Sequence, residues 1–207
     1  MRMSIMAATA VTASVLFAAS AAQAAFVVQE GNIPQFDDNV IANGCDAGVG
    51  IAGPALQVAG CLNGDRGQQV LFTSDEAITY SGGQATVEAE DGNGFSYLKI
   101  EVVGTSFDSL ILNINASEDG QVQFGDGTDL SGFFDLSSGG ANFFTITGAD
   151  LPFIEFWTTD ASVSVDIAET TRQVRIGGVG SVQISEPALG GLLGLGMLGI
   201  AMARRRA

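Results

Sequence analysis

The amino-acid sequence predicts an all-β fold, a single antiparallel β-sandwich of jelly-roll type, over residues 25–184. Two observations indicate this fold. Short runs rich in Val, Ile, Phe and Thr alternate with clusters of Gly, Asn, Asp and Ser, as strands alternate with turns. Several runs also place apolar residues at every second position, which is the pattern of strands that bury one face. The region shows neither a sustained helical period nor an internal repeat typical of a solenoid or propeller.

The chain begins with a segment typical of a secretory signal peptide. An apolar, Ala-rich run covers residues 5–22, and Ala22 and Ala24 supply the small side chains that signal peptidase recognises. We therefore expect cleavage before Ala25, which makes residues 1–24 the signal peptide and signal peptidase a partner during export.

The first part of the body contains the only two cysteines, Cys45 and Cys61. In an exported chain such a pair is expected to form a disulfide. The loop between them is rich in glycine and has fifteen intervening residues, so closing it is worth about 3 kcal/mol in the chain-entropy model. Before this loop we expect a short strand at 26–28 and a turn region at 31–38.

The remainder of the body alternates regularly between expected strands and turns. In the run 97–103, Leu98, Ile100 and Val102 share one face while Lys99 and Glu101 occupy the other. Similar patterns place Leu110, Leu112, Ile114, Val163, Val165, Ile167, Val174 and Ile176 inward, with Arg172 and Arg175 near the outer surface. The expected strands are residues 69–72, 85–89, 97–103, 109–115, 121–124, 142–147, 154–158, 162–167, 172–176 and 182–184.

The chain ends in an apolar segment followed by basic residues. Sixteen uncharged residues, 188–203, span about 24 Å as a helix, against a hydrocarbon core of about 30 Å. We expect a short transmembrane helix, with the basic cluster on the cytoplasmic side and the body outside. The tail 185–207 thus has three parts: Ser185-Glu186-Pro187, the span 188–203, and Arg204, Arg205 and Arg206.

The order of these parts resembles the PEP-CTERM sorting signal of Gram-negative bacteria. Glu186 and Pro187 match its Glu-Pro pair, and 204–206 match its terminal arginines, whereas Ser185 stands where the family has a proline. The resemblance implies transient anchoring in the inner membrane, followed by processing near Glu-Pro by exosortase, a protease-transpeptidase. It also implies a place at the cell surface or outside the cell, among exopolysaccharide. The alternative is a plain C-terminal anchor.

Two further resemblances concern the function of the body. Phrases such as Asn142-Phe143-Phe144-Thr145-Ile146 resemble a β-rich domain that many PEP-CTERM proteins carry and that implies no known activity. The same terminus is sometimes labelled as that of an ice-binding protein. Ice binding requires a repeated threonine array, and this body has one Thr-x-Thr (Thr145, Thr147), so that function is not expected.

Composition excludes several classes of function. The body holds 22 of the 23 acidic residues and four basic ones, a formal charge of −18. Such a surface repels nucleic acid, whose phosphates require Lys and Arg. The chain contains no histidine, which excludes imidazole catalysis, Ser-His-Asp and Cys-His sites and most zinc sites.

Acidic turns leave one cofactor question open. The turn 126–129 offers carboxylates and carbonyls that suit calcium, with Asp126 and Asp129 as the first candidates. Asp-Gly is also an ordinary hairpin turn, and neither the EF-hand spacing nor a nonapeptide repeat is present. Both interpretations stand, and no other cofactor is expected.

Aromatic residues divide into core and candidate binding groups. Phe is mainly core material, whereas Trp157, Tyr80 and Tyr97 can be half exposed. Because Trp157 lies opposite Phe156 on its strand, one of the two faces out. We expect a non-enzymatic exported protein of the cell surface or extracellular matrix. The alternatives are a calcium-assisted carbohydrate-binding module, which needs an exposed aromatic platform, and a secreted hydrolase, which needs two carboxylates facing across a cleft.

Overall fold

The computed structural model describes residues 26–159 and 168–180, and this part of the chain contains strands, turns and loops but no helix. The predicted all-β fold is therefore confirmed. The strands are β1 (Val27–Glu30), β2 (Asp37–Ile41), β3 (Ala55–Leu62), β4 (Gln69–Ser81), β5 (Thr86–Ala89), β6 (Tyr97–Val102), β7 (Phe107–Ala116), β8 (Gly120–Gly125), β9 (Leu130–Leu136), β10 (Asn142–Leu151), β11 (Phe153–Thr159) and β12 (Ala168–Gly177).

Several predicted features lie outside the described residues: the signal peptide with its cleavage site at Ala22, Ala24 and Ala25, the strands 162–167 and 182–184, and the tail 185–207. Within the described ranges, no helix is long and apolar enough to cross a membrane.

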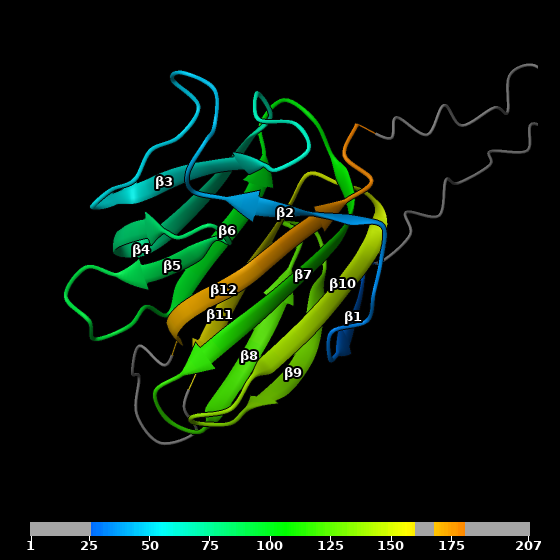
Figure 1. The fold of residues 1–207 in the computed structure, drawn as a ribbon. Coiled ribbons are helices and arrows are strands. Elements are labelled where there is room, and N and C mark those ends of the chain that lie inside the picture. Colours follow the sequence, from blue (N-terminus) through cyan, green and yellow to red (C-terminus); the bar gives the residue numbers. More distant parts are fainter. Residues whose placement is uncertain (1–25, 160–167, 181–207) are drawn as a thin grey trace, which may run out of the picture.

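All pairs of named strands are antiparallel and belong to one continuous sheet. The order is β1-β10-β7-β12-β2-β3-β4-β6-β11-β8-β9, and β5 pairs with both β12 and β4. Strands β12, β2, β3, β4 and β5 therefore close a small ring, visible at the left of Figure 1. The rest of the sheet extends from this ring as two arms that end in the edge strands β1 and β9.

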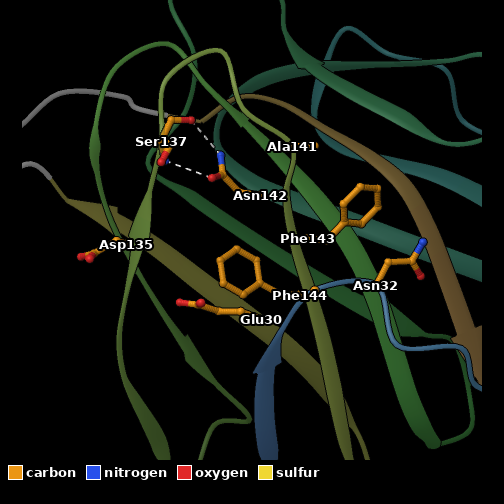
Figure 2. Close-up of a pocket in the computed structure, with 9 residues that line it drawn as sticks. Glu30, Asn32, Asp135, Ser137, Ala141, Asn142, Phe143 and Phe144 are labelled. Carbon is orange, nitrogen blue, oxygen red and sulfur yellow. Dashed lines mark hydrogen bonds between the residues drawn. The ribbon is translucent and has the colours of Figure 1, made fainter.

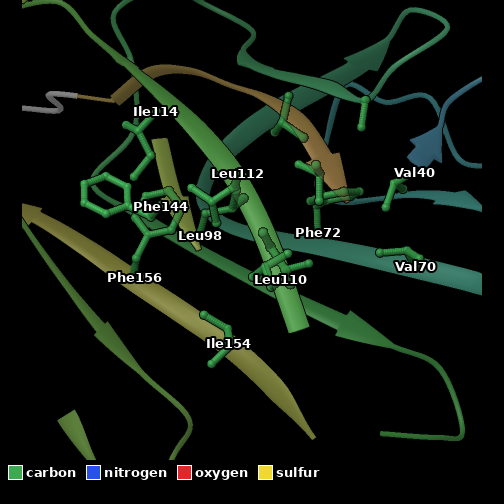
Figure 3. Packing of buried hydrophobic residues seen from close by; sticks show 14 of the residues in the cluster. Val40, Val70, Phe72, Leu98, Leu110, Leu112, Ile114, Phe144, Ile154 and Phe156 are labelled. Atoms are coloured by element: carbon green, nitrogen blue, oxygen red, sulfur yellow. The ribbon is translucent and has the colours of Figure 1, made fainter. Parts of the chain in front are cut away.

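Side chains of the two arms meet in one core. Phe144 of β10 and Phe124 of β8 belong to different arms, yet their ring centroids lie 5.0 Å apart. Phe134 of β9 also reaches Phe144, at 5.7 Å. Figure 3 shows Leu110 and Leu112 of β7 among the same buried cluster. Burial of these side chains from both arms is the main stabilising contribution to the fold.

Nine predicted strands coincide with observed ones, although β4 and β10 are longer than expected. The sequence analysis missed β2, β3 and β9. Strand β2 begins with Asp37 and Asp38, which favour turns, and β3 lies inside the glycine-rich region closed by the cysteines. Strand β2 is held by pairing with the distant strand β12, whereas β3 pairs with β4, the next strand along the chain. The partner of β2 is invisible in a local pattern.

Strand β12 contains a bulge that explains its side-chain directions. Arg172 and Val174 are two positions apart, so a regular strand would place both side chains on one face. The register shifts between Arg172 and Arg175, and Gln173 adopts a φ of 55°. The inserted residue reverses the alternation. Val174 is consequently buried while Arg172 is exposed, as predicted.

The predicted disulfide is present. Cys45 and Cys61 are joined, with 5.6 Å between their Cα atoms, which lies within the usual range for a disulfide. Cys61 belongs to β3, and Cys45 lies in the loop that follows β2. The bond therefore ties this irregular loop to a buried strand.

The outer faces of the two arms differ in what covers them. Residues 31–36 cross the outer face of β10 and β7 on their way to β2 (Figure 1). The Thr145 hydroxyl accepts a bond from the Ile33 amide and donates one to the Gly31 carbonyl. Ile111, which alternates with core residues of β7, is fully buried there. On the other arm, outward side chains of β11 and β9 stay accessible.

Candidate binding face

Four residues form one transverse row on the outer face of the second arm. Trp157 of β11 lies opposite Tyr97 of β6 on one side and Gln123 of β8 on the other, and Gln123 lies opposite Phe133 of β9. Their chain neighbours Leu98, Phe156, Phe124 and Phe134 point into the core. Because strand side chains alternate between faces, the row must point outward. We call Tyr97, Trp157, Gln123 and Phe133 the aromatic row.

Trp157 is the centre of this row. Its side chain is 36% exposed, whereas its neighbour Phe156 is fully buried, so the outward residue of the pair is the tryptophan. The Tyr97 and Trp157 ring centroids lie 5.7 Å apart with a tilt of 42°. A Cβ added at Gly125 would stand 3.1 Å from the Trp157 Cζ3 atom. The absence of a side chain at Gly125 therefore leaves room for the indole to lie against the sheet.

The apolar surface extends from Trp157 onto the edge strand β9. Phe133 is 58% exposed and Leu130 is 62% exposed. Leu130 pairs with Gly125 and would lie 3.0 Å from a Cβ added there. Two strand spacings of about 4.8 Å separate β11 from β9. The backbones that carry the two exposed rings, Trp157 and Phe133, thus lie about 10 Å apart across the sheet.

Polar groups accompany these rings at short range. The Tyr97 hydroxyl donates a hydrogen bond of 2.9 Å to the Glu155 carboxylate. Burial first, and then this hydrogen bond and the charges of Glu155, Glu101 and Asp75, raise the pKa of the Tyr97 phenol above its usual range. Gln123 donates its amide to the Ser131 carbonyl at 2.8 Å, which holds its side chain along the strip. A ligand on the rings would therefore meet carboxylate and amide oxygens beside them.

The acidic turn between β8 and β9 borders the same face. Asp126 Oδ1 accepts the backbone N–H groups of Thr128 and Asp129, each at 2.8 Å, which is the geometry of a side-chain-stabilised turn. Gly127 in this turn has a φ of +87° and faces the Phe153 ring, so the turn lies directly beside the strip.

The calcium assignment to Asp126 and Asp129 stays a prediction. The bonds of Asp126 suit the turn interpretation. Across the two described ranges, no group of three or more His, Cys, Asp or Glu side chains is placed to hold a metal ion. A bound cation here would need ligands from backbone carbonyls, amide or hydroxyl side chains, or water.

A separate pocket of about 380 Å³ lies where the edge strands β1 and β9 approach each other (Figure 2). Glu30 and Asp135 are its acidic lining residues. Asn142 and Ser137 form two hydrogen bonds at its rim. The Asn142 side-chain amide donates to the Ser137 carbonyl at 3.1 Å, and the Ser137 backbone N–H donates to the Asn142 side-chain oxygen at 3.0 Å. Asp135 accepts a bond from Gln121 of β8, which directs it toward the outer face. Of the two acidic residues, Asp135 thus turns its carboxylate away from the pocket, as Figure 2 shows.

The structure places the predicted functional residues as follows. It joins Cys45 to Cys61, exposes Trp157 and sets Tyr97 against it, whereas Tyr80 is buried at 4% exposure. Sequence reasoning missed the role of Phe133, because it did not identify β9 as a strand. The available signal was the pair Phe134 and Leu136 with the polar Asp135 between them, which has the period of two of a strand. The sorting residues Ser185, Glu186, Pro187, Arg204, Arg205 and Arg206 lie outside the described residues.

Comparison of the chain with protein-family models, with curated proteins and with solved structures gives no match.

Proposed function

We propose that this chain is a non-enzymatic exported protein of the cell surface or extracellular matrix, whose β-domain binds polysaccharide through the aromatic row. The observation that carries the proposal is the exposed Trp157, set beside Tyr97 and in register with Phe133 on an uncovered strip of sheet. Aromatic rings of this kind offer a flat apolar surface with a polar rim. The faces of pyranose rings present C–H groups that stack on such a surface.

The dimensions and chemistry of the strip favour an extended chain of sugars over a small enclosed ligand. The strands that carry Trp157 and Phe133 lie about 10 Å apart, a separation comparable with the length of a disaccharide. Hydroxyl groups of the sugar would meet the Glu155 carboxylate and the Gln123 side chain beside the rings. An open face suits a polymer that continues past the protein in both directions.

The frame for this face is proposed to be a jelly-roll-like β-sandwich. Contacts such as Phe124 with Phe144 support two packed layers, since these rings come from opposite arms of the sheet. One layer carries the covering segment 31–36 on its outside, and the other carries the aromatic row. This asymmetry supports the assignment of the uncovered face to binding.

Export and sorting are proposed on the grounds of sequence. The segment 1–24 has the order of parts of a signal peptide, and the tail 185–207 resembles a PEP-CTERM signal. In this proposal the tail holds the protein in the inner membrane until exosortase processes it. The processed domain then resides among exopolysaccharide outside the cell.

The test is binding of the full chain, purified in detergent, to polysaccharide isolated from the extracellular matrix of its host. We expect Trp157→Ala to weaken binding at least tenfold, because the central stacking surface is lost; tenfold corresponds to about 1.4 kcal/mol. Phe36→Ala is the matched control, because Phe36 is a fully exposed aromatic residue outside the row. Equal effects of both substitutions, or no binding by the unaltered protein, would refute the proposal.

A further inference from the structure

The aromatic row is bordered mainly by carboxylates. Glu155 is the next outward residue from Trp157 on β11 and lies opposite Lys99 of β6, and Glu101 is one outward position further along β6, opposite Phe153. Asp75 accepts the Tyr97 amide at 3.2 Å, which places a third carboxylate at the Tyr97 end. Asp126 and Asp129 add the acidic turn beside Phe153, and Asp135 lies beyond Phe133 on β9. Acidic side chains therefore lie at the Tyr97 end of the row, along its Glu155 side, and at Asp135 on its other side.

The one basic residue on these strands does not offset this charge. Lys99 is the only Lys or Arg in β4, β6, β8, β9 and β11. Its ammonium group forms an ion pair with Glu101 and lies 4.3 Å from the centroid of the Phe153 ring. Lys99 is thus already engaged by a carboxylate and an aromatic face, and the Glu155 carboxylate next to it has no cation partner in the described structure.

We infer that the aromatic row binds a polysaccharide that carries free amino groups, such as one with unacetylated hexosamine units. This inference rests on the proposed function and names its substrate class. The sugar faces stack on Trp157 and Phe133, while protonated amines lie near Glu155 and the acidic turn, where charge-assisted hydrogen bonds form. An acidic polysaccharide, built from uronate or sulfated sugars, meets mainly like charge along the border of the row.

The Tyr97 phenol supports the same view of the local field. Burial is the main cause of the raised pKa of this group, followed by the hydrogen bond to Glu155. The charges of Glu101 and Asp75 raise the pKa further. A site in which several carboxylates act on one exposed strip attracts cations and increases their rate of encounter. The charge pattern therefore complements an amine-bearing chain and excludes an anionic one.

The experiment compares three oligosaccharide probes of equal length on the full chain in detergent, by isothermal titration calorimetry at low salt. The probes are a glucosamine hexamer, an N-acetylglucosamine hexamer and a galacturonate hexamer. We expect the glucosamine hexamer to bind at least tenfold more tightly than its acetylated form, and the galacturonate hexamer to show no binding. The preference for glucosamine should shrink as salt screens the carboxylates.

Two variants separate a local site from the general negative charge of the protein. Glu155→Gln keeps the shape and the hydrogen-bond acceptor for Tyr97 but removes one charge from the row. Glu169→Gln removes the same charge from β12, where Glu169 is exposed and bonds to Asn115. We expect Glu155→Gln to reduce the preference for glucosamine over N-acetylglucosamine at least threefold and Glu169→Gln to leave it unchanged.

The outcomes distinguish failure of this inference from failure of the proposed function. Equal or tighter binding of the acetylated hexamer, still weakened by Trp157→Ala, overturns the amine preference and leaves polysaccharide binding intact. Equal effects of Glu155→Gln and Glu169→Gln also overturn it, because attraction is then general. If no probe and no host polysaccharide binds, the proposed function fails and the inference fails with it.

Discussion

Phe133 and Phe134 provide a sharp test of the structure, because two identical neighbours in β9 are assigned opposite roles. Phe134 packs into the core, with ring centroids 6.1 Å from Phe124 and 5.7 Å from Phe144. Phe133 lies on the outer face and is 58% exposed. The perturbation is the same truncation to alanine at each position. We expect Phe134→Ala to cost stability and preserve binding, and Phe133→Ala to do the reverse.

The magnitudes follow from burial. Truncating a fully buried Phe costs about 3–5 kcal/mol. Phe134 is half-buried on an edge strand, and it also loses two ring contacts, so we expect about 2–3 kcal/mol. Phe133 loses little buried area, and its truncation should cost less than about 1 kcal/mol. For a domain of this size, 1 kcal/mol shifts Tm by about 2–4 °C, so Phe134→Ala should lower Tm by about 4–12 °C.

The assay is thermal unfolding of the full chain followed by circular dichroism, paired with polysaccharide binding below the transition. The stability order and the binding order of the two variants should be opposite. A larger loss of Tm for Phe133→Ala than for Phe134→Ala would refute the reasoning. That result would mean that β9 is paired one residue out of register, since such a slip moves every side chain to the other face.

Three other perturbations test separate parts of the account. Replacing Cys45 and Cys61 by alanine should lower the free energy of unfolding by about 3 kcal/mol, measured by guanidinium denaturation; an unchanged midpoint would show that the disulfide does not constrain the unfolded chain. Gly60→Ala should cost about 1–3 kcal/mol in the same assay, because its Cβ would stand 2.6 Å from the Ile41 carbonyl oxygen; a stable variant would contradict this close approach. Glu186→Ala should leave the protein in the membrane fraction with its arginine tail attached, as checked by intact mass, and normal release of this variant would leave only a plain anchor.

Local patterns in the sequence predicted much of the fold. Alternation in the runs around Leu98 and Leu110 correctly predicted strands and their buried faces, because period-two apolar spacing has one structural solution in which a face is buried. The pair Cys45 and Cys61 was likewise predictable, since the chain offers one partner for each cysteine. For Trp157 and Phe156, the sequence predicted that one of the two side chains points outward, because neighbouring residues of a strand face opposite sides. It did not predict which one.

The sequence by itself therefore determined the fold class, most strands, the disulfide and the acidic, histidine-free chemistry. Only the tertiary structure decided that Tyr97, Trp157, Gln123 and Phe133 form one row, and that residues 31–36 cover the opposite face. The physical reason is that alternation along a strand specifies which side chains share a face, whereas the order and register of strands depend on pairing between distant segments. A binding face assembled from four strands exists only after that pairing has formed.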